Sequence, residues 1–263
     1  MATYKGIQGY SVQKLATDPT AGSGSEGQLW YNSSSGAFKI GTAGAGAWAA
    51  GGDMNVGRST GAGAGASQDA ALAIGGTPDG ISPVNAVESY NGTTWTEVAD
   101  MLIPRRYLVG MGTQTAALAC GGSPSSSNVE KWDGSSWTEV NNLTRSTSPS
   151  NTTSYAVGFG SSTSAIFAGG SEGPAQLDLC EQWNGTSWAE VADLNGTRSY
   201  GMGAGTSGSA GLFSGGMVGG PPISATNEQW NGTSWTEVND INTARKSGAA
   251  SCQGTVTASL IFG

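Results

Sequence analysis

The stretch Glu88–Val98, ESYNGTTWTEV, decides the fold because it recurs with small changes along the chain. Close copies are EKWDGSSWTEV at 130–140, EQWNGTSWAEV at 181–191 and EQWNGTSWTEV at 228–238. Each copy sets an Asn-Gly or Asp-Gly pair between β-prone residues, which is a strong signal for a hairpin. The sequence therefore predicts a chain of repeated β-hairpins.

The repeat length identifies the kind of β-structure. The tryptophan after the turn of each copy, with an earlier one ahead of them, recurs at steps of 47, 42, 51 and 47 residues, at Trp48, Trp95, Trp137, Trp188 and Trp235. Gly-Gly pairs keep a similar period and begin at Gly75, Gly121, Gly169 and Gly215. Each unit reads as four strands, of which Gly/Ala-rich segments such as 201–205 are the innermost, where small side chains fit a crowded axis. Four strands at this period are typical of a propeller blade.

Several landmarks together resemble a known family. The apolar run ending in Gly-Gly, the Glu-x-Trp/Tyr, the spaced tryptophan and a downstream arginine resemble the kelch repeat of kelch-like propellers and galactose oxidase, over about residues 26–263. WD repeats and sialidase-type Asp boxes fit less well, because Trp132-Asp133 begins a turn and Asp133–Trp137 is one residue short of an Asp box. The resemblance implies an all-β, kelch-like β-propeller.

The two ends of the chain predict the number of blades. Residues 26–32 look like a third strand with its turn, and 259–262 look like a second strand. We therefore expect five blades, with a closing blade in which 26–40 and 254–263 share one sheet. Either 37–40 or the segment at Trp48 would form its outer strand. The expected domains are an anchoring tail and linker at 1–25 and the propeller at 26–263.

Composition argues against several classes of function. A net charge of −8 is unlike the basic surface that nucleic-acid binding requires. No segment approaches the ~20 apolar residues of a membrane span, so we expect no membrane insertion. The chain has no histidine and only three scattered cysteines, Cys120, Cys180 and Cys252, which we interpret as buried free thiols. We expect no metal and no cofactor.

One arginine follows the tryptophan strand of every unit. These arginines are Arg58, Arg105, Arg145, Arg198 and Arg245. They could line a channel mouth that holds a carboxylate or phosphate. We favour a structural role instead, a clasp between each arginine and the aspartate five residues before it, because a feature of every blade serves what every blade needs. Asn142 replaces that aspartate in one unit, which predicts that Arg145 is the arginine without a partner.

The repeated glutamates raise the alternative of an enzyme. Glu88, Glu130, Glu181 and Glu228 could suggest glycoside hydrolysis, which needs two carboxylates converging on one bond. Residues related by a repeat point to separate places, so we expect them to be structural and the chain to have no catalytic residues. The missing histidine also removes the usual general base.

Partner contacts are expected on the loops between the second and third strands, which vary between units while the hairpin turns do not. Binding residues concentrate on variable loops held by a rigid scaffold. The candidate contact residues are Pro78, Asp79, Ser125, Ser126, Ser127, Glu172, Pro221 and Pro222. Strand direction places these loops on the face of the blade-to-blade connections, opposite the hairpin turns at Thr93 and Ser135.

The first residues suggest where the protein acts. MATYKGIQGY at 1–10 and EGQLWYNS at 26–33 resemble the start of bacteriophage virion proteins, tail fibres and head-surface proteins among them. This resemblance implies a virion-surface protein, held to other virion proteins through 1–25 and presenting the propeller to a host surface protein or glycan. The alternatives are a cytoplasmic kelch-type interaction adaptor and, third, a carbohydrate-active enzyme.

Overall fold

The structure, a computed structural model, describes residues 13–16, 29–40, 50–124, 127–145, 153–219, 222–251 and 253–263. Its described residues form strands and no helix. The chain divides into two compact units, Met1–Ala50 and Gly51–Gly263. The expected domain boundary after residue 25 falls outside the described residues and stays a prediction.

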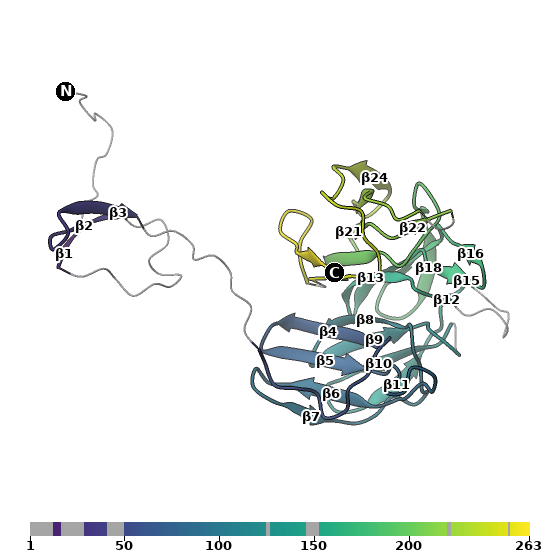
Figure 1. The fold of residues 1–263 in the computed structure, drawn as a ribbon. Helices are drawn as coiled ribbons and strands as arrows, with labels where there is room; N and C mark the ends of the chain where they lie inside the picture. The colour runs from purple at the N-terminus through teal and green to yellow at the C-terminus, as the bar shows by residue number, and fades with distance from the viewer. Residues whose placement is uncertain are drawn as a thin grey trace. The chain divides into compact units, whose positions relative to one another are not determined.

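The larger unit has a propeller-like arrangement of four antiparallel, four-stranded blades, each with its strands in chain order (Figure 1). The first blade consists of β4 (Ala62–Ser67), β5 (Ala70–Ile74), β6 (Val87–Tyr90) and β7 (Trp95–Glu97). The second consists of β8 (Val109–Thr113), β9 (Ala116–Cys120), β10 (Val129–Trp132) and β11 (Trp137–Val140). The third consists of β13 (Val157–Ser161), β14 (Ser164–Ala168), β17 (Cys180–Trp183) and β18 (Trp188–Val191). The fourth consists of β20 (Met202–Ser207), β21 (Ala210–Ser214), β23 (Asn227–Trp230) and β24 (Trp235–Val238).

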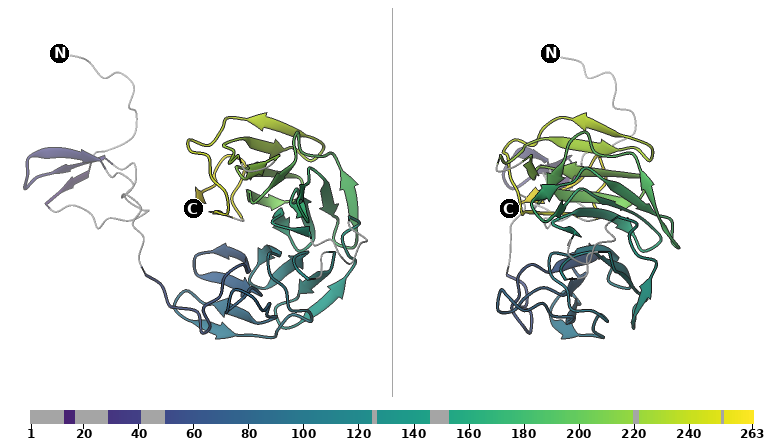
Figure 2. Two further views of the ribbon diagram at one scale, coloured as in Figure 1. Left: turned by 45° about the vertical axis from the view of Figure 1, so that its right-hand side comes forward. Right: turned by 90° about the vertical axis from the view of Figure 1, so that its right-hand side faces the viewer.

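The innermost strands β4, β8, β13 and β20 are neighbours in that order, and the blades follow an arc in the left view of Figure 2. Their glycines are required by close approach. A Cβ at Gly110 of β8 would lie 2.5 Å from the carbonyl oxygen of Gly63 in β4, and one at Gly203 of β20 would lie 2.3 Å from Val157 in β13. The crowding expected from the glycine-rich segments is confirmed.

The repeated motif forms the predicted hairpin, with a loop closed by a side chain. Tyr90 pairs with Trp95, so four residues form the loop. The Asn91 side-chain oxygen accepts hydrogen bonds from the amides of Thr93 and Thr94 at 3.0 and 2.9 Å. Gly92 takes a left-handed φ of 92°. Equivalent loops begin at Asp133, Asn184 and Asn231.

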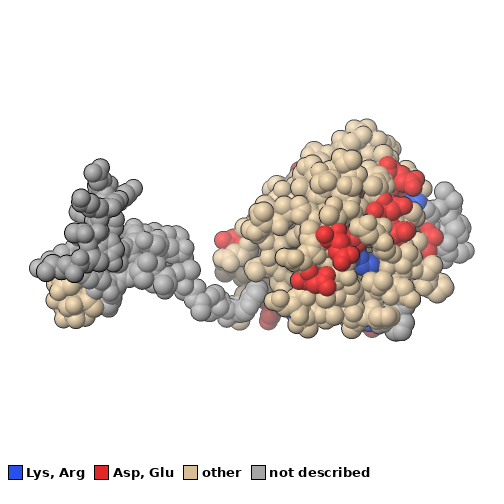
Figure 3. All heavy atoms as spheres, turned by 90° about the horizontal axis from the view of Figure 1, so that it is seen from above, with Lys and Arg blue, Asp and Glu red and all other residues tan. Residues whose placement is uncertain are grey.

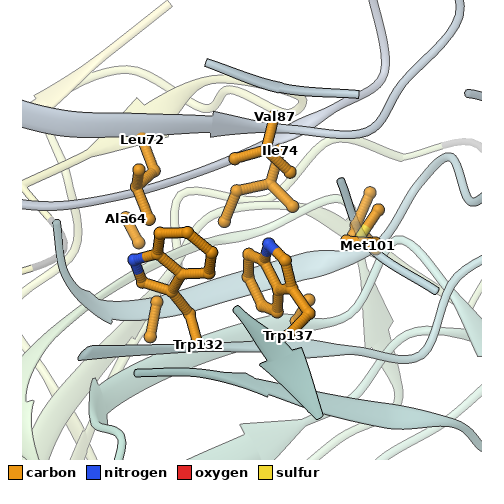
Figure 4. Close-up of a cluster of buried hydrophobic side chains, with 10 residues drawn as sticks. Ala64, Leu72, Ile74, Val87, Met101, Trp132 and Trp137 are labelled. Carbon is orange, nitrogen blue, oxygen red and sulfur yellow. The ribbon is translucent and has the colours of Figure 1, made fainter. Parts of the chain in front are cut away.

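Hydrophobic residues are buried mainly between consecutive blades, in interfaces that we call joints. At the first joint, Leu72 and Ile74 of the first blade pack with Trp132 and Trp137 of the second (Figure 4). The second and third joints repeat this arrangement with Trp183 and Trp188, and with Trp230 and Trp235. Each joint is thus filled largely by the aromatic pair of the later blade.

The prediction of a fifth, shared closing blade is wrong. Among the described residues, β2 (Leu29–Asn32) and β3 (Ala37–Ile40) form a sheet with β1 (Gln13–Leu15), whereas β25 (Ala249–Ala250) pairs with β26 (Ile261–Phe262) in another sheet. Because β2 lies between β1 and β3, both of its edges are already paired. Residues 37–40 form the strand after the turn at Asn32, and Trp48 lies outside the described residues.

The connections between blades lie on the same face as the loops between second and third strands. In the third unit, β12 (Thr153–Ser154) pairs with β15 (Ser171–Glu172), which also pairs with β16 (Ala175–Gln176). In the fourth, β19 (Arg198–Ser199) pairs with β22 (Met217–Val218). Single bridges join Ser59 to Thr77 and Arg106 to Ser123. We call this side of the propeller the loop face.

Candidate functional site

Most of the arginines that follow the tryptophan strands act as clasps, three of them between two blades and Arg58 between the first blade and the segment before it. Four of them form buried ion pairs with the glutamates of the third strands: Arg58–Glu88, Arg105–Glu130, Arg145–Glu181 and Arg198–Glu228. The nitrogen–oxygen distances of the first three are 2.9, 2.8 and 2.9 Å. The guanidinium of Arg105 also donates to the carbonyl oxygens of Gly121 and Asn128. Its desolvation lowers the pKa of Arg105 from the usual value.

The backbone of Arg105 and Arg198 bonds to the preceding blade. The Arg105 amide donates to Val84 and its carbonyl accepts from Gly76, both between the second and third strands of the first blade. Its guanidinium reaches the second blade. One residue thus joins two blades, and the same atoms are not available to a ligand.

The expected aspartate partner was wrong, and so was the prediction that Arg145 has no partner. The Asp193 carboxylate instead accepts from the Cys180 amide at 3.2 Å within its own blade, and Asn142 accepts from Val129 in the same way. Arg145 pairs with Glu181 and is buried. The aspartate is not the partner because the arginine side chain extends forward to the next blade, away from the aspartate that precedes it in the chain.

Arg245 differs from the other four. Its Nη1 donates to the Gly263 carbonyl at 3.4 Å, and its backbone bonds to Gly216 and Ser224 of the fourth blade. Among the described residues it has no carboxylate partner, and it is only partly buried. In the described part of the chain, Arg245 therefore bonds to the fourth blade through its backbone but lacks the buried ion pair that the other four arginines form.

A column of three tyrosines lies on the loop face and was missed by the sequence analysis. Tyr107, Tyr155 and Tyr200 each precede an innermost strand. The rings of Tyr107 and Tyr155 have centroids 4.5 Å apart, and those of Tyr155 and Tyr200 stack at 3.9 Å. The repeat offered a signal, since two of these tyrosines stand two residues after a clasp arginine. A longer connection hides the third.

The tyrosines belong to a set of left-handed residues at equivalent positions. The set is Thr60, Tyr107, Tyr155, Tyr200 and Ser247, with φ values of 60°, 56°, 60°, 59° and 56°. This conformation costs roughly 1–2 kcal/mol in a residue other than glycine. Backbone bonds join successive members of the set: the Tyr107 amide donates to the Thr60 carbonyl, the Tyr200 amide to that of Tyr155, and the Ser247 amide to that of Tyr200. The backbone explains the conformation, but not the choice of tyrosine.

Two cations flank the column. The Arg106 guanidinium lies 5.2 Å from the centre of the Tyr107 ring, and Lys246 Nζ lies 5.7 Å from that of Tyr200. The neighbouring Tyr155 phenol, with burial, raises the pKa of Tyr107. Burial and the neighbouring Tyr200 phenol raise the pKa of Tyr155. Tyr107 and Tyr155 therefore stay protonated at neutral pH.

The expected contact loops border this column. Pro78, Asp79 and Pro222 are exposed, while Ser127 and Glu172 are half-buried. The backbone amides of residues 81 and 82 donate to Asp79 and hold the pKa of its carboxyl at about 2. The remaining contact residues lie outside the described residues: Ser125, Ser126 and Pro221. Arg106 ties one loop to the column by donating to the carbonyl of Ile81 at 2.9 Å.

The opposite end of the innermost strands is covered by the C-terminal segment. Gln253 Nε2 donates to the carbonyls of Gly112 and Gly160 at 3.3 and 3.1 Å. These glycines lie near the ends of β8 and β13, whereas the tyrosine column lies where those strands begin. The left view of Figure 2 shows the C-terminus on the inner side of the arc.

The thiols have structural positions. Cys120 and Cys180 are free and buried in the second and third joints, as predicted, and Cys252 lies outside the described residues. Burial raises the pKa of Cys120 well above its usual range and that of Cys180 to about 12. In the described part of the chain, no three His, Cys, Asp or Glu side chains gather as metal ligands would.

Comparisons with known proteins leave the fold and the loop face as the basis for function. No protein-family model and no curated protein matches the chain. The described ranges also hold no helix with the length and apolar character needed to cross a membrane.

Proposed function

We propose that the chain is a bacteriophage virion-surface protein that binds a host surface protein or glycan through the loop face of its propeller. The observation that carries the binding part is the tyrosine column, set between two cations and bordered by loops that differ from blade to blade. The virion part is supported by the resemblance of 1–10 and 26–33 to phage structural proteins. In this proposal residues 1–25 attach the chain to other virion proteins.

The finer assignment to the kelch class is part of this proposal. It is supported by the recurrence of Gly-Gly, Glu-x-aromatic and tryptophan landmarks on equivalent strands of the four blades. The arginine–glutamate clasp recurs with them.

We propose a non-catalytic role. Each repeated glutamate is buried and paired with the arginine that precedes its blade, so the four carboxylates do not converge on one bond. The repeated tryptophans Trp137, Trp188 and Trp235 are likewise buried in the joints. Both sets of residues thus have a structural use that competes with catalysis.

The experiment has two readouts, composition and adsorption. Mass spectrometry of purified phage particles should find the chain, and excess free protein should block particle adsorption to host cells. Replacing Asp79 and Pro222 by Ala should reduce that blocking at least tenfold, because both side chains are exposed on the loop face. Thr93→Ala with Ser135→Ala, on the hairpin face, is the matched control. Absence from particles, or equal loss from both variants, would contradict the proposal.

A further inference from the structure

Free positive charge in the propeller is concentrated at the tyrosine column. Four arginines of the larger unit are consumed in buried ion pairs. The other cations in 51–263 are Arg106, Lys131, Arg245 and Lys246, and all except Lys131 lie in the connections between blades. Acidic side chains cover more of the face shown in Figure 3 than basic ones do. On a protein with net negative charge, a local excess of cations favours the binding of an anion at that place.

The geometry of the column favours an anion over a neutral sugar. Ring faces that bind neutral sugars by stacking must be open. Here Tyr155 lies against both other rings, while Arg106 and Lys246 occupy the outer faces of Tyr107 and Tyr200. What remains for a ligand is the hydroxyl edge of the column and the two cations.

The Tyr200 end of the column brings a phenol and an ammonium together. Tyr155 stacks on Tyr200 at 3.9 Å, and Lys246 Nζ lies 5.7 Å from the centre of the Tyr200 ring. The Tyr200 hydroxyl is the hydrogen-bond donor at this end of the column. A hydrogen-bond donor and an ammonium together are what a carboxylate or sulfate requires.

The tyrosines are not needed for the fold at these positions. Thr60 and Ser247 take the same left-handed conformation, and each has a backbone bond across its joint, without an aromatic ring. Strained residues that the scaffold does not require are a mark of function. The three rings stand in consecutive connections and end at the cation.

We propose that the Tyr200 hydroxyl and Lys246 bind the carboxylate or sulfate of an acidic saccharide, with the rest of the column holding Tyr200 in place. The inference rests on the proposed function, because it specifies what the loop face recognises. Arg106 has a different task, since it anchors the loop at Ile81. The only partner of Lys246 Nζ among the described hydrogen bonds is the Met217 thioether sulfur at 3.4 Å, which is a weak acceptor, so Lys246 is the decisive residue.

The test is titration of the full chain with sialyllactose, sulfated lactose, lactose and inorganic sulfate, followed by calorimetry or NMR. Both acidic saccharides should bind at least tenfold more tightly than lactose or sulfate alone, and more weakly as salt screens the charge. Lys246→Gln should weaken binding at least tenfold, and Tyr200→Phe, which keeps the ring, several-fold. Lys131→Gln on β10 is the matched control and should change nothing.

Three results would overturn the inference: no binding of either acidic saccharide, equal binding of lactose or sulfate, or no effect of Lys246→Gln. Adsorption separates this failure from failure of the proposed function. If Lys246→Gln protein blocks particle adsorption as well as the unchanged protein does, the loop face still binds the host and the saccharide site is wrong. Circular dichroism of each variant checks that the blades are intact.

Discussion

The repeated tryptophan is buried at the joints between consecutive blades but partly exposed on the open side of the first blade. Trp137, Trp188 and Trp235 at the joints are only 5, 5 and 6% exposed, whereas the equivalent Trp95 is half-buried. The Trp95 indole donates to the Gly52 carbonyl, while those of Trp137 and Trp188 have no acceptor among the described residues. The difference shows that the preceding blade buries this ring, and that burial outweighs a missing hydrogen bond.

The arginines repeat the contrast at the other end of the arc. Arg105 joins two blades through buried groups, whereas Arg245 bonds to the fourth blade and only to the Gly263 carbonyl beyond it. Among the described residues, the buried ion pair therefore forms only where a blade follows the arginine. This comparison leads to three measurements of stability.

The largest effect is expected from the buried clasp. Arg105→Ala should lower the free energy of unfolding by about 3–5 kcal/mol, because it leaves the Glu130 charge buried and unpaired. Arg245→Ala should lower it by less than about 1 kcal/mol, because its bonds are partly exposed. Urea denaturation measures both. Similar losses from the two variants would show that Arg245 completes a clasp with a partner elsewhere.

The tryptophans should show an intermediate effect. Trp188→Ala removes a ring from the core of the second joint and should cost about 3–5 kcal/mol. Trp95→Ala should cost clearly less, since its ring already contacts solvent. Thermal unfolding of the two variants compares them directly. An equal loss would mean that the first blade is covered in solution.

The smallest effect concerns the left-handed residues. Ser247→Gly should raise stability by several tenths of a kcal/mol, because relief of roughly 1–2 kcal/mol of backbone strain exceeds the roughly 0.5–1 kcal/mol entropic cost of glycine. Tyr200→Gly should instead lower stability, because it also removes the stack on Tyr155. Chemical denaturation resolves the two signs. A loss in Ser247→Gly would place a side-chain role at that position.

Local sequence patterns predicted the strands and hairpins, because the signals for both lie within one short motif. They could not predict the partner of the clasp arginine, since Glu130 lies on the next blade and no short spacing links it to Arg105. The count of blades failed for a related reason. Landmarks count repeat units, but pairing of β2 with β1 is parallel and leaves no local pattern. The tyrosine column could be predicted only by comparing the units two residues after the arginine, and the longer connection before Tyr155 breaks that spacing.

The positions of the clasp residues in the sequence also constrain how gene duplication can add a blade. Each arginine precedes its glutamate by 25 to 36 residues, so the pair lies in one continuous segment that starts before the sheet does. A duplication that copied only β8 to β11 would carry Glu130 without Arg105 and bury a lone charge. One that began near residue 99 would carry the pair intact. The segment that must be duplicated therefore begins before the four strands of the blade. A blade added by such a duplication would carry both the arginine and the glutamate that attach it to the blade before it.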